Sequence, residues 1–103
     1  MFHKANKNFL FALLACAGCS TGRPTLDYVM AREAFNSAKE VDAARYSPGY
    51  FHKAEENYRS GEKNYRDHLY GEASEDFKAA KIYSEKAENA SRVQRQKSGD
   101  EGI

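Results

Sequence analysis

Apolar and small residues recur along one helical face between residues 48 and 66, and this pattern constrains the fold more than any other feature of the sequence. Its members recur at alternating spacings of three and four and are Phe51, Ala54, Tyr58, Gly61 and Tyr65. Such spacing places side chains on one side of an α-helix, whereas a strand would need every second residue. Glycine inside a helix costs about 1 kcal/mol relative to alanine, so Gly61 predicts the close approach of another helix.

A proline break separates this helix from the segment before it. The sequence Tyr46-Ser47-Pro48-Gly49 should end one helix and begin the next. Proline disfavours helical geometry in the preceding residue but fits the first position of a helix, and Ser47 then becomes the N-cap. We expect helices over residues 25–45, 48–66 and 69–95, with a tight turn before the third.

The other two predicted helices also carry alanine-rich faces. In the first, the expected inward residues are Ala31, Ala34, Ala38, Val41 and Ala44, with Phe35 beside them. In the third, they are Ala73, Phe77, Ala80, Ala87 and Ala90. Helices joined by short turns pack as antiparallel neighbours. The sequence therefore predicts an all-α fold, an antiparallel three-helix bundle or hairpin array within residues 24–95.

The beginning of the chain has the build of a secretory signal. A polar start with Lys4 and Lys7 precedes an apolar run from Phe9 to Ala15, and small residues follow. A helix that crosses a bilayer needs about 20 apolar residues, and this run reaches Gly18 at the latest. We therefore predict a signal peptide over residues 1–15, or alternatively 1–18.

Two cysteines follow that run, and the residues before them suggest lipid attachment. Leu13, Leu14 and Ala15 before Cys16 resemble a bacterial lipobox, in which the cysteine sulfur takes a diacylglyceryl group as a thioether. Cys16 has the better aliphatic match, whereas Cys19 gives a longer leader and a small-residue context, so both sites stay open. Two or three acyl chains hold a protein to a bilayer far more firmly than one. Aspartate follows neither cysteine, so resemblance to enterobacterial sorting signals suggests the outer membrane.

The segments that flank the predicted domain are short and polar. Residues 16–23 are expected to form a lipidated tether, and residues 96–103 a disordered tail. The three predicted faces are mostly alanine, so a domain of this size has little apolar volume to bury. We therefore regard a homo-oligomer, or support from a partner protein, as possible.

Residues of the second and third helices resemble one tetratricopeptide-type helix pair. The resemblance is carried by Gly61, Tyr70, Ala73, Phe77 and Ala80. It implies that the two helices pack closely as a binding module. The usual large residues early in the first helix and the closing proline are absent, and a solenoid needs at least three repeats.

Residues 24–92 also resemble a family of short bacterial envelope lipoproteins known as a domain of unknown function, sometimes fused to OmpA-like domains. The shared pattern is an alanine-rich first helix, the Tyr-Ser-Pro break, and alanines at every third or fourth position of the last helix. It rests on Ala31, Ala34, Ala38, Tyr46, Pro48, Ala54, Ala73, Ala80 and Ala87. The resemblance implies a place in the cell envelope rather than an activity.

Composition and motifs favour a protein without catalytic chemistry. The formal net charge is +1, with mixed signs throughout, which argues against nucleic acid as a partner. His52 with Glu55 and Glu56 has a spacing that could place a nitrogen and a carboxylate on one helical face. Two ligands alone do not make a zinc site, so a solvated polar face is expected. No nucleophile with a base and no phosphate loop is evident. We expect no metal, no small-molecule substrate, and no cofactor other than the lipid on the cysteine.

Tyrosine is the remaining distinctive feature, with seven copies. Tyr28, Tyr50 and Tyr83 do not fall cleanly on the apolar faces, and tyrosine is enriched where proteins meet. We therefore expect a non-enzymatic interaction or structural protein, anchored in the outer membrane and facing the periplasm. An alternative is a pilotin-like factor that assists assembly of an outer-membrane machine.

Overall fold

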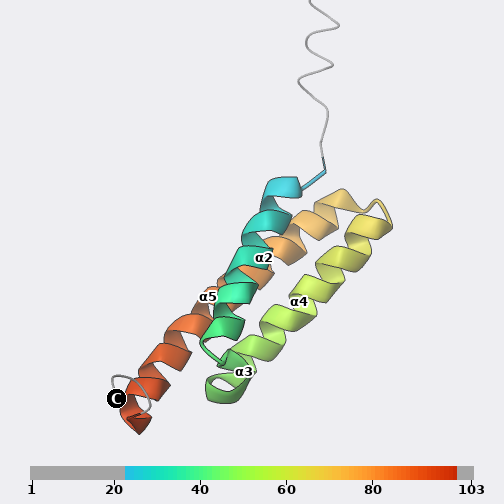
Figure 1. The fold of residues 1–103 in the computed structure, drawn as a ribbon. Coiled ribbons are helices and arrows are strands. Elements are labelled where there is room, and N and C mark those ends of the chain that lie inside the picture. The colour runs from blue at the N-terminus through green and yellow to red at the C-terminus, as the bar shows by residue number, and fades with distance from the viewer. Residues whose placement is uncertain (1–22, 100–103) are drawn as a thin grey trace, which may run out of the picture.

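The computed structural model describes residues 23–99, which form helices joined by short turns, with no strand in that range. The helices are α2 (Thr25–Glu40), α3 (Ala43–Tyr46), α4 (Pro48–Arg66) and α5 (Tyr70–Ser98). Figure 1 shows α4 running antiparallel to both α2 and α5, which therefore run in the same direction. The prediction of an all-α helical bundle is confirmed.

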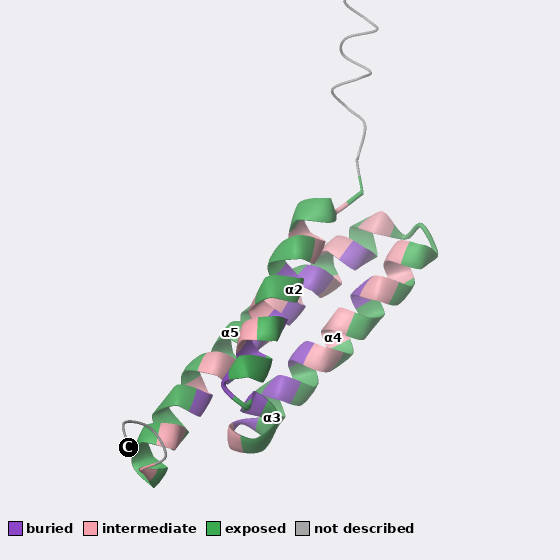
Figure 2. Cartoon of the chain, in the orientation of Figure 1, coloured by how far each residue is buried: buried purple, intermediate pink, exposed green. Residues whose placement is uncertain are grey.

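α5 is the helix on which the other elements assemble. α2 and α4 each pack extensively against α5, whereas their backbones approach one another at few positions. Figure 2 shows buried residues on the sides of the helices that face one another, and largely exposed turns at the C-terminal end of α5. The bundle is thus a pair of helices laid on a third, longer one.

Small residues on α5 explain this arrangement. Its buried residues are Ala73, Phe77, Ala80, Ser84, Ala87 and Ser91. They alternate at spacings of four and three, the pattern that keeps one face of a helix against its neighbours. Alanine and serine occupy all but one of these positions, so the backbones of α2 and α4 can lie close to α5.

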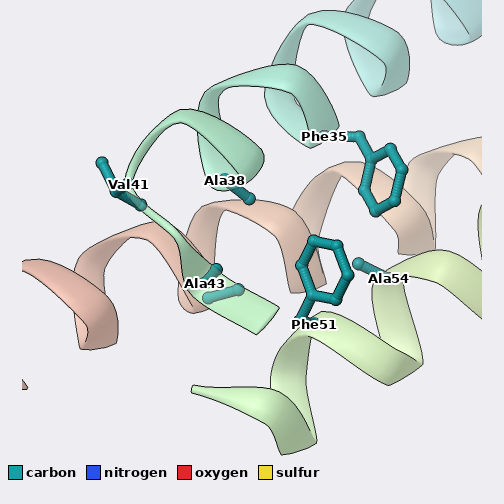
Figure 3. Packing of buried hydrophobic residues seen from close by; sticks show 7 residues of the cluster. Phe35, Ala38, Val41, Ala43, Phe51 and Ala54 are labelled. Atoms are coloured by element: carbon teal, nitrogen blue, oxygen red, sulfur yellow. The ribbon is translucent and has the colours of Figure 1, made fainter. Parts of the chain in front are cut away.

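Aromatic rings fill the wider space between α2 and α4. Phe35 of α2 stacks on Phe51 and Tyr58 of α4, with centroids 5.2 and 5.3 Å apart. Figure 3 shows the rings of Phe35 and Phe51 turned toward one another, with Ala54 beside them. Aromatic pairs at such separations add stability beyond the area that they bury.

The predicted first helix, residues 25–45, is wrong in one respect, because it is interrupted after Glu40. Asp42 has φ 60°, in the left-handed region, and α3 follows as a separate turn. Aspartate tolerates this conformation better than most residues, so the chain can turn there without glycine or proline. After the turn Ala43 is buried and Ala44 exposed, and within α2 Phe35 is buried whereas Ala34 is half-buried.

α4 begins at Pro48 and ends at Arg66, as the proline break predicts. Ser47 occupies the N-cap position, but its side chain makes no capping hydrogen bond. Its hydroxyl instead donates to the carbonyl oxygen of Ala87 in α5 at 2.7 Å. The residue that starts α4 therefore also ties the chain to α5.

α5 is longer than predicted, because it continues to Ser98 rather than ending near residue 95. Gly99 follows with φ 75°, and its backbone N–H points to the carbonyl oxygens of Arg95 and Gln96. Glycine in this conformation is a common helix stop, which explains the later end. The predicted tail over residues 96–103 is thus helical for its first part, and residues 100–103 lie outside the described range.

Candidate functional site

The predicted lipid-attachment residues lie outside residues 23–99. They are Leu13, Leu14, Ala15, Cys16 and Cys19. Within the described residues, we find no helix that is both long and apolar enough to pass through a bilayer. Lipid attachment therefore stays a prediction from the sequence, and the described part can be searched for surfaces that bind partners.

The α4–α5 pair is built around the contact of Gly61 with Phe77. A Cβ atom on Gly61 would lie 2.7 Å from Cε1 and 2.8 Å from Cδ1 of the Phe77 ring, so no larger residue fits without a shift. Phe77 is fully buried, and Ala73 and Ala80 lie one turn to either side of it in the same core cluster. Tyr70 opens α5 and contacts the Tyr65 ring edge-on, with centroids 5.6 Å apart. The residues quoted for the helix-pair resemblance are therefore close together in space.

Tyr28 belongs to this interior rather than to a free surface. Its ring centroid lies 5.0 Å from that of Phe77, 6.1 Å from Tyr58 and 6.3 Å from Tyr65. It is half-buried and packs on the cluster that contains Ala31 and Phe77. The sequence interpretation of Tyr28 as lying off the packed face is thus wrong, because a ring is needed to span the gap between α2 and α4.

Tyr58 connects the two parts of the core and has a perturbed phenol. It packs against both clusters of buried residues, one around Phe35 and Phe51 and the other around Phe77. Burial raises the pKa of Tyr58 well above its ordinary value, and the neighbouring Tyr28 hydroxyl and the charge of Glu62 raise it further. The phenol is therefore held in its neutral form.

Hydrogen bonds between side chains surround the Phe77 region. Ser74 of α5 donates to Asp27 of α2 at 2.6 Å. Asp76 of α5 accepts from Ser60 at 2.8 Å and from Asn64 at 2.7 Å, both in α4. These bonds link α2 and α4 to α5. They give the carboxylates structural partners rather than leaving them as a pair for acid–base chemistry.

Buried hydroxyls form the contact that sequence reasoning missed. The Oγ atoms of Ser47 and Ser91 lie 2.6 Å apart, and Ser47 also donates to Ala87. Ser84 is fully buried with no hydrogen-bond partner for its Oγ within the described residues. Ser84 and Ser91 continue the four-and-three spacing of the buried alanines of α5, and this spacing could have indicated their burial. Serine is usually exposed, which hid the pattern.

Tyr50 and Tyr83 lie together on α4 and α5. The Lys86 ammonium lies 5.9 Å from the centroid of the Tyr50 ring and 5.6 Å from that of Tyr83. Lys53 lies 5.4 Å from the Tyr83 ring. We call these four residues the tyrosine–lysine patch. Two of the three tyrosines chosen from the sequence thus share a surface, and Tyr28 does not belong to it.

A hollow of about 420 Å³ adjoins this patch. It lies between the start of α4 and the second half of α5 and is lined by Tyr46, Ser47, Gly49, Tyr50, Lys53, Ala90 and Gln94. Tyr50 is 42% exposed and Lys53 is exposed, so a partner can reach both. Exposed aromatic rings beside cations and a recess are features of surfaces that bind proteins.

The opposite end of the bundle has a smaller hollow of about 240 Å³. Its lining is Tyr28, Glu62, Tyr65, Arg66 and Phe77. Nearby, interaction with Tyr70 and then with Tyr65 raises the pKa of Arg23. A hydrogen bond from Lys63 at 2.9 Å lowers the pKa of Asp67. Asp67 and Lys63 thus form an ion pair on the surface at this end.

The histidines of the described residues do not gather metal ligands. Between residues 23 and 99, no three His, Cys, Asp or Glu side chains come together in a way that could hold a metal ion. His52 is exposed, and Glu55 beside it pairs with Arg59 at 3.1 Å. His68 lies in the turn before α5 with φ 63°, where its ring contacts Tyr70. It is a turn residue and not the N-cap, which is Leu69.

Comparisons with protein-family models, with curated proteins and with solved structures returned no match for this chain. The candidate site therefore rests on the geometry of the described residues. Its main element is the tyrosine–lysine patch with the adjoining hollow.

Proposed function

We propose that this chain is a lipid-anchored protein of the bacterial cell envelope that binds a partner protein through its helical domain and performs no catalysis. The observation that carries the binding role is the tyrosine–lysine patch, because Tyr50 and Lys53 line an open recess and Lys86 lies beside the Tyr50 ring. The predicted signal and lipobox support the location. The proposed partners are other envelope proteins and a second copy of the chain.

The chemistry of the patch indicates what kind of partner fits. Lys53 and Lys86 each lie over a ring, so their ammonium groups remain available on their outer sides to carboxylates. The exposed ring of Tyr50 and the recess beside it offer apolar contact. A protein segment with acidic and apolar side chains would match both features.

Photocrosslinking in intact cells tests this surface. A photoreactive phenylalanine at position 50 should give a discrete crosslinked product, and Lys53→Glu with Lys86→Glu should abolish it, because a charge reversal repels an acidic partner. The matched control is the same probe at Asn36, which is exposed on α2, a helix that contributes no residue to the patch. Equal products from positions 50 and 36, or none from position 50, would contradict the proposal.

Mass spectrometry of the purified native product tests the anchor. An acylated N-terminal Cys16 or Cys19 is expected, and the mass identifies which of the two is used. A product that begins at Met1 with both thiols unmodified would overturn the envelope assignment.

A further inference from the structure

The first turns of α2 expose three large apolar side chains at the end where the chain enters the bundle. Leu26 is 71% exposed, Met30 is 41% and Val29 is 38%. Spacings of three and four place Val29 and Met30 one turn beyond Leu26, so the three side chains adjoin one another. Single exposed apolar residues are ordinary on proteins, whereas an adjoining group at one end of a small domain calls for a contact.

The inner face of α2 does not need these residues. Tyr28 and Ala31, from the same two turns, already pack against Phe77 and the alanines of α5. The turn between α4 and α5 lies at the same end of the bundle as the start of α2 (Figure 1). It contains Leu69, which is 46% exposed. Exposed apolar side chains thus gather where Arg23 leads into α2.

The covalent reach of the chain limits what can cover this end. Arg23 is seven residues from Cys16 and four from Cys19. At about 3.5 Å per residue, the fully extended connection spans about 25 Å from Cys16 and about 14 Å from Cys19. If either cysteine carries acyl chains, as the proposed function requires, the first turn of α2 stays within about 25 Å of the bilayer surface.

We propose that Leu26, Val29 and Met30 form a contact with the lipid surface, so that the anchored domain stands on the N-terminal end of α2. This inference rests on the proposed lipid anchor. The charged residues within one turn of these three are of both signs: Arg23, Asp27, Arg32 and Glu33. The contact is therefore apolar and does not depend on anionic headgroups.

Such a contact would hold the tyrosine–lysine patch away from the membrane. From Tyr70 to Lys86 the axis of α5 rises by about 24 Å, at 1.5 Å per residue. The partner surface would then lie toward the far end of an upright bundle, where a protein in the surrounding space can reach it. A random orientation of the tethered domain would give no such separation.

Tryptophan scanning provides the test, because the chain contains no tryptophan of its own. Leu26→Trp is compared with Val93→Trp, a position on α5 that is 49% exposed near the opposite end of the bundle. Each lipid-anchored full chain is placed in phosphatidylcholine vesicles, with and without brominated acyl chains. The tryptophan at position 26 should emit further to the blue and be quenched several-fold more strongly than the one at position 93. Equal emission and quenching at the two positions would overturn the proposal.

Three further measurements distinguish the possible causes of the quenching. With a Leu69→Trp reporter, the triple change Leu26→Ser, Val29→Ser and Met30→Ser should weaken quenching, because it removes the apolar contact but leaves the core face intact. A contact that forms only when phosphatidylglycerol is added would be electrostatic and would contradict the apolar one. Mass spectrometry of each sample distinguishes the failures: an acylated chain whose position 26 stays in water defeats this inference alone, whereas an unmodified chain defeats the proposed function.

Discussion

The two halves of the bundle hold together by different means. In the half near Arg23, rings of Tyr28, Tyr58 and Tyr65 surround Phe77, the largest fully buried side chain of the described residues. In the half near α3, the fully buried side chains on α5 are Ser84, Ala87 and Ser91. The Ser47 hydroxyl hydrogen-bonds to the Ser91 hydroxyl and donates to the backbone carbonyl oxygen of Ala87. The first half thus depends on the shape of one ring. The second combines small residues on α5 with the hydrogen-bonded pair Ser47 and Ser91 and with the stacked rings of Phe35 and Phe51.

Removing the ring should give the largest effect. Phe77→Ala is expected to lower the free energy of unfolding by about 3–5 kcal/mol, because the side chain is fully buried and its neighbours can collapse only in part. A loss of that size is a large share of the stability of a small domain. Urea unfolding followed by circular dichroism measures it. The exposed control Ile82→Ala should change stability by less than about 0.5 kcal/mol, and similar midpoints for both variants would refute the account of this half.

Filling the space beside the ring should have a smaller but clear effect. Gly61→Ala should destabilise by about 1–3 kcal/mol through overpacking, since its Cβ would meet the Phe77 ring at 2.7 Å. This loss must exceed the gain of about 1 kcal/mol that alanine brings to a helix interior. Thermal unfolding is the measurement.

Gly71→Ala is the matched control, because nothing lies within 4 Å of a Cβ at that position. It should be neutral or slightly stabilising. Combining Gly61→Ala with Phe77→Leu should recover part of the loss by freeing space. If Gly61→Ala stabilises the protein as Gly71→Ala does, the close approach of α4 and α5 is not tight.

Hydroxyl deletion examines the other half of the bundle. Ser47→Ala should cost about 1 kcal/mol, because it leaves Ser91 and the carbonyl of Ala87 without that partner. Ser84→Ala should be neutral or stabilising, since its Oγ is buried with no partner among residues 23–99. Chemical denaturation measures the change in the free energy of unfolding of each variant. A larger loss for Ser84→Ala than for Ser47→Ala would contradict this comparison.

The smallest expected effect concerns Tyr58, which the two halves share. Its pKa is raised in the folded state, so the folded protein holds the phenol proton more tightly than the unfolded chain. The contribution of this phenol to the free energy of unfolding is therefore fully present below the ordinary tyrosine pKa of about 10. It is lost as the pH rises above that value. Tyr58→Phe should therefore flatten the alkaline decline in unfolding midpoint. If the decline is the same in Tyr58→Phe, the loss of stability at alkaline pH comes from other groups.

The sequence predicted the structure correctly where the local preference of a residue was not opposed by a tertiary contact. Proline explains the start of α4 at Pro48, and the spacing from Phe51 to Tyr65 is that of a packed helical face. Gly61 predicts a close approach because glycine is unfavourable inside a helix unless space demands it. In these cases the local preference and the tertiary contact agree.

The features that sequence reasoning missed depend on the distance between helices. Tyr28 points inward because the α2–α4 gap is wide enough for rings, which one-dimensional spacing does not reveal. Ser91 is buried because Ser47 reaches it from another element. Asp42 adopts a left-handed conformation where neither glycine nor proline marks a turn. Each of these depends on a partner remote in sequence or on a residue of weak local preference.

The odd number of long helices has a practical consequence. Because α4 reverses the direction of α2 and α5 restores it, the polypeptide enters at Arg23 and leaves at Gly99 on opposite poles (Figure 1). The 29 residues of α5 separate these poles by about 44 Å. A reporter or affinity tag fused after residue 99 would therefore be carried far from the entry point, and would suit imaging or capture that leaves the entry pole undisturbed.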